Sequence, residues 1–366
     1  MKLCDFCQKV EIEDNVSYCG SCSARIIKMG MLLQSLKVKP EEAEKAFEDI
    51  KKEQNMTCKI RQMPEFVVMV GLSGSGKTTI AKEKYATHIY ISSDDLRAEL
   101  YGDVNDQRHN GKIFEEMFKR SADALEEGQS VVYDATNLSA KRRKSLINNM
   151  RAAIRGNFWA VACVVLTTYE NCLIRNALRD RVVPEDVIRR QFLTFQCPTE
   201  HEGFDAIYLK HTESYGNRVS YICNCMKSMA KMNHDNPHHP DTIFEHSVNV
   251  MKTMMEAAPP FDCTSLYGQT GFYHDVGKLY TKFFDDNGIA HFNNHDAPSA
   301  YISLLAPDGP LQDQEKIVMA AAIGWHMKEY SYQTEEGYKT WLDTLIPEYR
   351  DLLMALNRAD RINSVA

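Results

Sequence analysis

Between residues 64 and 222 the sequence alternates short apolar runs with segments whose apolar residues recur at helical spacing. The apolar runs have the length of strands. This alternation predicts an α/β fold, a parallel sheet with helices on both faces that binds ligands at the carboxyl ends of its strands. The predicted strands are 66–70, 88–92, 130–134, 158–167 and 206–210.

The strand pattern ends near residue 233. From there the chain has the pattern of helices joined by loops that contain Pro and Gly, which predicts an all-α domain over 233–366. Ahead of the α/β domain, 63–222, lie a cysteine-containing element, 1–23, and a helical linker, 24–62. We therefore expect two domains preceded by a small element on a tether.

Composition places the chain among ordinary globular proteins, with 44% hydrophobic and 25% charged residues. No apolar run has the length of a membrane helix and no signal-peptide pattern opens the chain, so we expect a cytoplasmic protein with no membrane partner. The net charge is −7, and residues 223–366 hold 19 acidic against 11 basic residues. A nucleic-acid partner would therefore need a local basic path.

A phosphate-binding loop follows the first predicted strand. The segment Gly71-Leu-Ser-Gly-Ser-Gly-Lys77-Thr78 has the pattern G-x-x-x-x-G-K-[ST], with a strand before it and a helix after it. Glycines let backbone N–H groups surround a phosphate at a helix N-terminus, Lys77 would reach the β- and γ-phosphates, and Thr78 would hold Mg²⁺. We expect ATP to contact Gly71, Ser73, Gly74, Ser75, Gly76, Lys77, Thr78 and Thr79.

Polar clusters follow the later strands at the same predicted edge of the sheet. Asp94 faces the γ-phosphate position as a candidate proton acceptor, with Arg97 one turn further on. Arg179 and Arg181 precede a helix that starts at Pro184, which is typical of a lid over a transferring phosphoryl group. A further cluster, after the third strand, contains Asp134, Asn137, Arg142 and Arg143.

Two C-x-x-C pairs lie in the first 22 residues. Two such pairs complete a tetrahedral Cys₄ site, which predicts structural Zn²⁺ bound by Cys4, Cys7, Cys19 and Cys22. Redox-active or buried thiols are the alternative.

Histidines gather in the last third of the chain. His274 and Asp275 are adjacent, and His246, His295, His326 and Asp360 surround them in the sequence. Neutral imidazoles and carboxylates are ligands of first-row divalent ions. Lys278 is a candidate contact for a substrate phosphate, and His238, His239 and His291 have no assigned role.

Residues 67–195 resemble the kinase domain of the bacteriophage-type polynucleotide 5′-kinases, through the phosphate-binding loop, the Asp94-Asp95-Leu-Arg97 element and the R-N-x-x-R…V-P lid. The resemblance implies that Asp94 is the general base for a 5′-hydroxyl and that Arg97 binds the acceptor phosphate. Arg179 would be the lid arginine, with Arg181 able to share its role. Arg97, Asp134, Asn137, Arg142 and Arg143 are the expected nucleic-acid contacts.

Residues 234–366 resemble the HD-domain metal-dependent phosphohydrolases, whose H…HD…D pattern matches His246, His274, Asp275 and Asp360. The positions of His295 and His326 resemble those of the six-ligand, two-metal members, which implies that Asp275 bridges two ions. The expected metals are Mn, Ni, Co, Fe or Zn. Some two-metal HD proteins are diiron oxygenases, so oxidation is a rival to hydrolysis.

A 5′-kinase joined to a phosphohydrolase resembles the end-healing enzymes that prepare broken RNA or DNA ends for a ligase. Such an enzyme would use an NTP to phosphorylate a 5′-hydroxyl end and would remove a 2′,3′-cyclic phosphate or 3′-phosphate. An RNA ligase acting downstream is an expected partner, in the cytoplasm of the cell or of a phage-infected host. The alternatives are a nucleoside or small-molecule kinase fused to a nucleotidase, and an ATP-switched binding protein whose HD metal site is structural.

Overall fold

The computed structural model describes residues 63–364 except 105, 237–240, 260–263 and 308, together with two short strands near the N-terminus. The chain divides into two compact units, 1–63 and 64–366. In the first unit, β1 (Lys2–Leu3) pairs antiparallel with β2 (Glu11–Ile12). The predicted zinc ligands Cys4, Cys7, Cys19 and Cys22 and the predicted linker helix lie outside the described residues, so both stay predictions.

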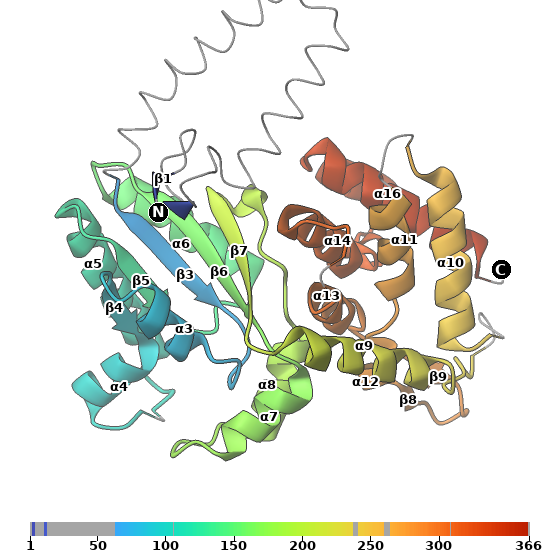
Figure 1. Ribbon diagram of the computed structural model, residues 1–366, viewed down its shortest axis with the longest axis horizontal. Coiled ribbons are helices and arrows are strands. Elements are labelled where there is room, and N and C mark those ends of the chain that lie inside the picture. The colour runs from blue at the N-terminus through green and yellow to red at the C-terminus, as the bar shows by residue number, and fades with distance from the viewer. Residues whose placement is uncertain are drawn as a thin grey trace, which may run out of the picture. The chain divides into compact units, whose positions relative to one another are not determined.

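A parallel five-stranded sheet forms the first part of the second unit (Figure 1). All five predicted strands are present, each within one residue of its predicted ends, and the α/β prediction for this segment is confirmed. The strand order is β4-β5-β3-β6-β7, which places the strand before the phosphate-binding loop at the centre. The strands are β3 (Glu65–Val70), β4 (Ile89–Ser92), β5 (Val131–Asp134), β6 (Trp159–Leu166) and β7 (Ala206–His211).

Side chains alternate between the two faces of this sheet, as the pleat of a strand requires. On β3, Val67 and Met69 pack on one face with Ala81 of helix α3 (Lys77–Lys84). Phe66 and Val68 pack on the other face, in a core that also contains residues of α5 (Asn110–Glu126), α6 (Ala140–Ala153) and α8 (Glu185–Leu193). Because helices cover both faces of the sheet, the inner strands β3 and β6 are apolar along nearly their whole length, which is why the sequence pattern detected them, whereas the edge strands β4 and β7 keep exposed residues such as Ile89 and Tyr208.

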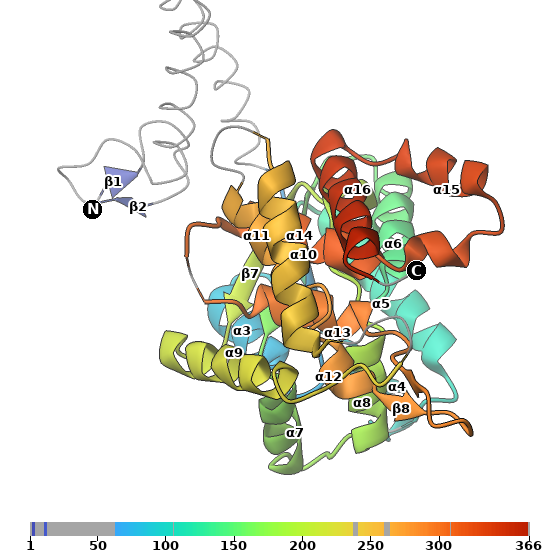
Figure 2. The same cartoon turned by 90° about the vertical axis from the view of Figure 1, so that its right-hand side faces the viewer.

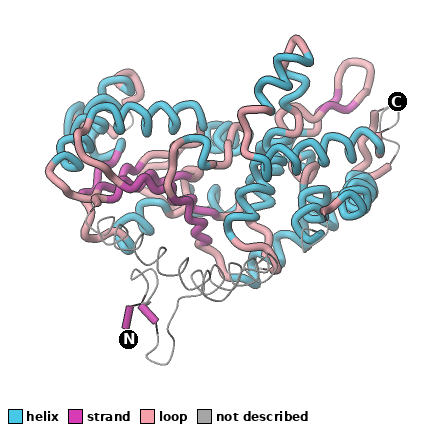
Figure 3. The backbone as a smooth tube through the Cα atoms, turned by 90° about the horizontal axis from the view of Figure 1, so that it is seen from above, coloured by secondary structure: helices cyan, strands magenta, loops and turns pink. Residues whose placement is uncertain are grey.

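The helices of this part follow the strands in turn, and Figure 3 shows the strands side by side with helices flanking them. Helix α4 begins directly after β4, where the Ser92 hydroxyl accepts hydrogen bonds from the amides of Asp94 and Asp95. Helix α4 spans Ser93–Tyr101, and α7 (Tyr169–Ala177) and a 3-10 turn (Glu200–Glu202) complete the helices of this part.

Helix α9 (Tyr215–Met229) leads from the sheet to the C-terminal part, which is mainly helical (Figure 2). A short antiparallel hairpin, β8 (Phe283–Phe284) and β9 (Ala290–His291), departs from the all-α prediction. Its strands have two residues each, too few for a period-two pattern to appear in the sequence. The helices are α10 (Ile243–Ala257), α11 (Thr264–Tyr273), α12 (Lys278–Thr281), α13 (Asp296–Leu304), α14 (Asp313–Trp325), a 3-10 turn (Lys328–Ser331), α15 (Glu335–Leu342) and α16 (Pro347–Ile362).

One apolar core joins the sheet to the C-terminal helices. It runs from Phe66 of β3 through Phe192 of α8 to Tyr301 of α13 and Leu353 of α16. The predicted boundary between 63–222 and 233–366 therefore falls inside a single compact unit. Among the described helices, none is both long and apolar enough to cross a membrane.

Candidate functional site

The loop between β3 and α3 has the backbone geometry that a phosphate-binding loop requires. Gly74 and Gly76 have φ values of 84° and 92°, in the left-handed region that residues with a side chain rarely adopt. A Cβ atom on Gly74 would also lie 2.2 Å from the carbonyl oxygen of Cys172. Both glycines are thus fixed by the fold, and the loop leads directly into the N-terminus of α3.

Lys77 and Thr78 are anchored at the start of α3. The Lys77 Nζ donates to the carbonyl oxygen of Leu72 (2.8 Å), and burial lowers the pKa of this ammonium group, an effect that Asp134 opposes. The Thr78 hydroxyl donates to Asp134 Oδ2 (2.9 Å), which also accepts a hydrogen bond from Tyr90 (2.7 Å). The expected nucleic-acid contact Asp134 therefore lies beside the predicted Mg²⁺ ligand, as the Walker-B aspartate does in P-loop enzymes.

Asp94, in the first turn of α4, lies between two arginines. Its Oδ1 accepts a hydrogen bond from Arg97 Nη1 (2.8 Å), and its Oδ2 lies 2.7 Å from Arg181 Nη1. Arg97 also donates to the carbonyl oxygen of Ser93 and to Asn110. Arg97 and Arg181 are thus ion-pair partners of the candidate base, and 41% of the Asp94 side chain remains exposed to solvent.

A cavity of about 1260 Å³ brings most of the predicted residues of this site together. Its size fits a nucleotide and an acceptor group. Predicted residues that line it are Ser73, Gly74, Gly76, Lys77, Thr78, Thr79, Asp94, Arg97, Asp134, Arg179 and Arg181. Gly71, Ser75, Asn137, Arg142 and Arg143 are not among its lining residues.

The structure contradicts the prediction that Arg143 contacts nucleic acid. Its side chain is 1% exposed and forms two hydrogen bonds with Glu202, at 2.6 and 2.8 Å. A third guanidinium contact goes to the carbonyl oxygen of Asn137, whose own side-chain amide donates to the Met69 carbonyl. Arg143 and Asn137 therefore hold the loop after β5 from inside the protein, and Arg143 cannot reach a nucleic acid.

We expect Arg143→Ala to destabilise the protein by about 3–5 kcal/mol, because it leaves the Glu202 carboxylate buried without its partner. Burial already raises the pKa of Glu202, and Arg143 opposes that rise. Urea unfolding followed by circular dichroism measures the loss. The matched control is Arg142→Ala, at the exposed neighbouring position, which should change stability by less than about 0.5 kcal/mol. Equal stability of the two variants would contradict the assignment.

Two residues near the loop were not predicted as site residues. The side chain of Gln191, on α8, accepts a hydrogen bond from the Ser73 amide (2.8 Å) and donates one to the Ser73 hydroxyl (3.0 Å). Arg175 lines the cavity that contains the phosphate-binding loop. A Cβ atom placed on Gly76 of that loop would lie 3.6 Å from the Arg175 Nη1 atom. Arg175 opens the lid motif in the sequence, which was a usable signal, whereas Gln191 lies 118 residues from its partner and had none.

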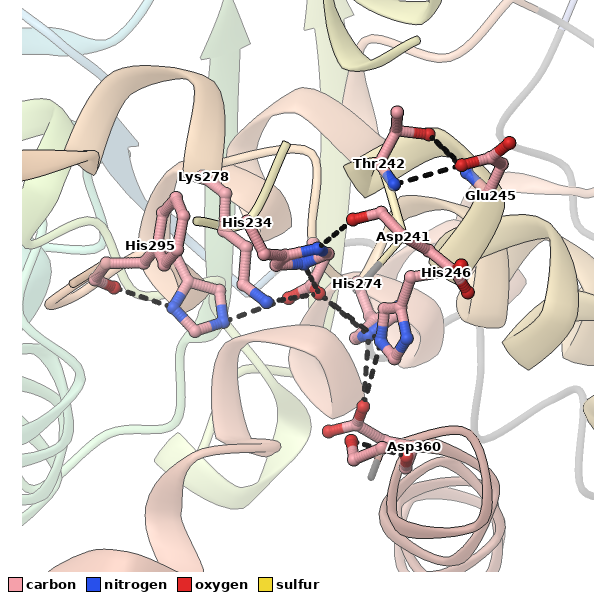
Figure 4. A network of polar contacts seen from close by, with 12 residues as sticks. His234, Asp241, Thr242, Glu245, His246, His274, Lys278, His295 and Asp360 are labelled. Atoms are coloured by element: carbon pink, nitrogen blue, oxygen red, sulfur yellow. Dashed lines mark hydrogen bonds and ion pairs between the residues drawn. The ribbon is translucent and has the colours of Figure 1, made fainter. Parts of the chain in front are cut away.

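A second cluster lies in the C-terminal helices, where the six predicted metal ligands come together. Two groups of three have ligand atoms within 4.8 Å of one another: His246, His274 and Asp275 form one, and Asp275, His295 and His326 form the other. Asp275 belongs to both groups. Asp360 lies beside the first group, with Oδ1 3.0 Å from His246 Nε2 and 3.7 Å from His274 Nε2 (Figure 4).

Backbone carbonyls orient three of the four imidazoles. The Nδ1 atoms of His274, His295 and His326 lie 2.7, 2.8 and 2.6 Å from carbonyl oxygens three residues earlier. A carbonyl only accepts hydrogen bonds, so each Nδ1 carries a proton and the Nε2 atom is left to bind either a proton or a metal ion at the centre. Burial and the neighbouring His295 lower the pKa of His326 to about 3, which keeps this ring neutral.

The surroundings of His274 favour a positive charge at the centre. His274 Nε2 is buried and has no hydrogen-bond partner among the described residues, as expected of an atom that binds an ion. Burial disfavours a charge on His274, but Asp275 and Asp360 outweigh it and raise its pKa to about 10. These observations and the donor set fit divalent transition metals.

Two basic residues complete the centre. Lys278, at the start of α12, has its Nζ 2.6 Å from Asp275 Oδ2. His234, which was not predicted as a ligand, is buried with Nε2 4.0 Å from the same carboxylate oxygen, and its Nδ1 lies 2.9 Å from the Asp241 carbonyl oxygen (Figure 4). Asp360 is the most exposed of the six residues, with 26% of its side chain exposed while those of His246 and His274 are buried, so we expect access to the centre from the Asp360 side.

Residues 66–198, about a third of the chain, match the AAA domain family AAA_33. With the loop, sheet and cavity above, this match defines the segment as a P-loop kinase-like domain. Domains of this kind bind ATP and Mg²⁺. None of the curated proteins matches the sequence.

Several solved structures are distantly similar. A Chloroflexus aurantiacus protein assigned as a kinase is 13% identical over 44% of this chain and 98% of its own, with a TM-score of 0.34. A chain of the Pnkp1/Rnl/Hen1 RNA repair complex is 19% identical over 35% of this chain and 43% of its own, with a TM-score of 0.31. A gluconokinase from Sinorhizobium meliloti is 18% identical over 42% of this chain and 85% of its own, with a TM-score of 0.29. Similarities this distant do not establish an activity for this chain.

Proposed function

We propose that this protein is a bifunctional nucleic-acid end-healing enzyme. It would phosphorylate 5′-hydroxyl ends with ATP in the kinase-like cavity and remove 2′,3′-cyclic phosphate or 3′-phosphate at the histidine–aspartate centre. One observation carries the proposal: a single compact unit contains two candidate sites. The first is a cavity lined by the phosphate-binding loop and the Asp94 carboxylate, and the second is a cluster of histidines and aspartates in which Asp275 belongs to both groups of three.

In the kinase-like cavity, the loop amides and Lys77 would bind the phosphates of ATP, and Thr78 and Asp134 would hold Mg²⁺, which supplies charge neutralisation. Asp94 would accept the proton of the attacking 5′-hydroxyl, since it is a carboxylate open to the cavity. Arg97 and Arg181 fix its position from both sides. Exposed Arg179, in the lid, would stabilise charge on the transferring phosphoryl group.

In the second centre, His246, His274, Asp275 and Asp360 would hold one divalent metal, and Asp275, His295 and His326 a second. Bound metals would supply Lewis-acid activation for phosphoester hydrolysis. The chain's own contribution is to orient the imidazoles of His274, His295 and His326 through their Nδ1–H groups and to fix Asp275 through Lys278. A phosphate that enters from the Asp360 side would meet the Lys278 ammonium as a charge partner.

The test uses an oligoribonucleotide with a 5′-hydroxyl and a 2′,3′-cyclic phosphate, incubated with ATP, Mg²⁺ and then Mn²⁺, Ni²⁺ or Co²⁺. Mass spectrometry reads both ends. We expect a phosphate gained at the 5′ end and the cyclic phosphate opened or removed at the 3′ end. If neither end changes while nucleosides are phosphorylated, the end-healing proposal is wrong.

A second candidate is a nucleoside or small-molecule kinase joined to a nucleotidase. The observation in its favour is that two basic residues expected to contact a polynucleotide pair with carboxylates of the protein itself: Arg97 with Asp94, and Arg143 with Glu202. A small acceptor needs fewer cationic contacts than a polynucleotide backbone. Competition between a 5′-hydroxyl oligonucleotide and a free nucleoside for the labelled phosphate of ATP distinguishes the two.

A further inference from the structure

Tyr301 connects the C-terminal helices to the end of strand β6. It lies on α13 and is fully buried. Its hydroxyl donates a hydrogen bond to the carbonyl oxygen of Thr167 (2.8 Å) and accepts one from the Thr167 amide (3.3 Å). Because a buried backbone group without a partner is costly, this one hydroxyl fixes the chain where it leaves β6.

Thr167 in turn contacts the phosphate-binding loop. Its hydroxyl donates to the carbonyl oxygen of Ser75 (2.9 Å), and both residues are fully buried. The Thr167 hydroxyl also contacts that of Thr212, which accepts a hydrogen bond from Arg175 in the ATP cavity (2.8 Å). A continuous set of hydrogen bonds therefore runs from α13 to the loop that would bind phosphate.

Helix α8 supports the loop from a second side and packs against the same tyrosine. Gln191 of α8 binds Ser73 of the loop through two hydrogen bonds. Its neighbour Phe192 packs edge-to-face on Tyr301, with ring centroids 5.5 Å apart, and Phe195 does so at 5.0 Å. Tyr301 thus contacts both structures that hold the loop, although it belongs to the part of the chain with the metal centre.

We propose that Tyr301 is a positioning residue for ATP binding, through which the C-terminal helices keep the phosphate-binding loop in its binding-competent shape. The inference deepens the proposed function and rests on it only for the binding of ATP in the cavity. A loop held in place before the ligand arrives does not draw on binding energy to become ordered. The kinase-like domain would therefore need the C-terminal helices for full affinity.

Tyr301→Phe tests this inference, because it removes only the hydroxyl. We expect the Kd for Mg²⁺-ATP, measured by calorimetry without any acceptor, to rise about threefold to tenfold, which is the usual net worth of one or two hydrogen bonds. The KM for ATP should rise by the same factor while kcat at saturating ATP is unchanged, because the bound triphosphate then orders the loop. General destabilisation would instead lower kcat through a smaller active fraction and leave KM unchanged.

Tyr349→Phe is the matched control. Tyr349 is 1% exposed, and its hydroxyl donates to Glu200, so it also joins the C-terminal helices to the sheet part. Glu200 lies outside the lining of the cavity, and we expect an unchanged Kd for ATP. An equal rise in Kd in the two variants would overturn the inference, as would a Tyr301→Phe enzyme with a lower kcat and an unchanged KM.

Thr167→Val provides a second, independent variant, since it removes the hydroxyl that reaches Ser75. We expect the same rise in Kd and, in the double variant with Tyr301→Phe, less than the sum of the two effects in free energy. Full additivity would contradict a shared path. Wild-type protein that binds ATP but phosphorylates no nucleic-acid end would refute the proposed function alone, and an unchanged Kd in Tyr301→Phe would refute this inference alone.

Discussion

Replacing Asp94 with asparagine is expected to lower 5′-phosphorylation by about 10²- to 10⁴-fold, the contribution typical of a general base. Asparagine keeps the size of the side chain but accepts no proton at neutral pH, and its single oxygen can accept from only one of Arg97 and Arg181. The measurement is transfer of labelled phosphate from ATP to a 5′-hydroxyl oligonucleotide. Opening of a 2′,3′-cyclic phosphate should be unchanged, because the histidine–aspartate centre is built from other residues.

Asp95→Asn is the matched control for this experiment. Asp95 is the next residue of α4 and is exposed, so its replacement removes a carboxylate of the same charge from the same helix turn. We expect it to keep most of the kinase activity. Equal losses in the two variants would mean that the local negative charge matters more than the position of Asp94. Loss of both activities in Asp94→Asn would contradict independent sites.

Asp275→Asn is expected to lower phosphoester hydrolysis by at least about 100-fold and to lower metal content at both positions, because Asp275 belongs to both ligand groups. His326→Ala removes a ligand of only one group and should lower the content of one metal. Elemental analysis of protein reconstituted with Mn²⁺ or Ni²⁺ gives the stoichiometry. Kinase activity should persist in both variants.

Asp286→Asn serves as the control, since Asp286 is an exposed carboxylate in the β8–β9 hairpin turn, outside both ligand groups. If His326→Ala and Asp275→Asn lose the same amount of metal, a shared role for Asp275 is wrong. Consumption of O₂ by iron-loaded protein, without phosphate release, would instead favour the oxygenase chemistry that the same ligand pattern permits.

The sequence alone determined the α/β sheet and the phosphate-binding loop, because both depend on local patterns. The inner strands of the sheet are covered on two faces and so show as apolar runs, as Phe66 and Val67 of β3 illustrate by packing on opposite faces. Gly74 and Gly76 are required by left-handed backbone angles inside a motif of eight residues. The histidines and aspartates that come together in the C-terminal helices were also visible in the sequence, since the HD pair and its flanking histidines form a recognisable pattern, and their role as metal ligands stays a prediction.

Only the tertiary structure decided which basic residues face a ligand and which support the fold. Arg143 bonds to Glu202 across 59 residues of sequence, Gln191 bonds to Ser73 across 118 residues, and Tyr301 bonds to Thr167 across 134 residues. Periodicity and motif spacing report on neighbours within one or two helical turns and carry no signal for partners so far along the chain. Because burial and partner geometry decide whether a charged or hydroxyl group is available to a ligand, these assignments depended on how the elements pack.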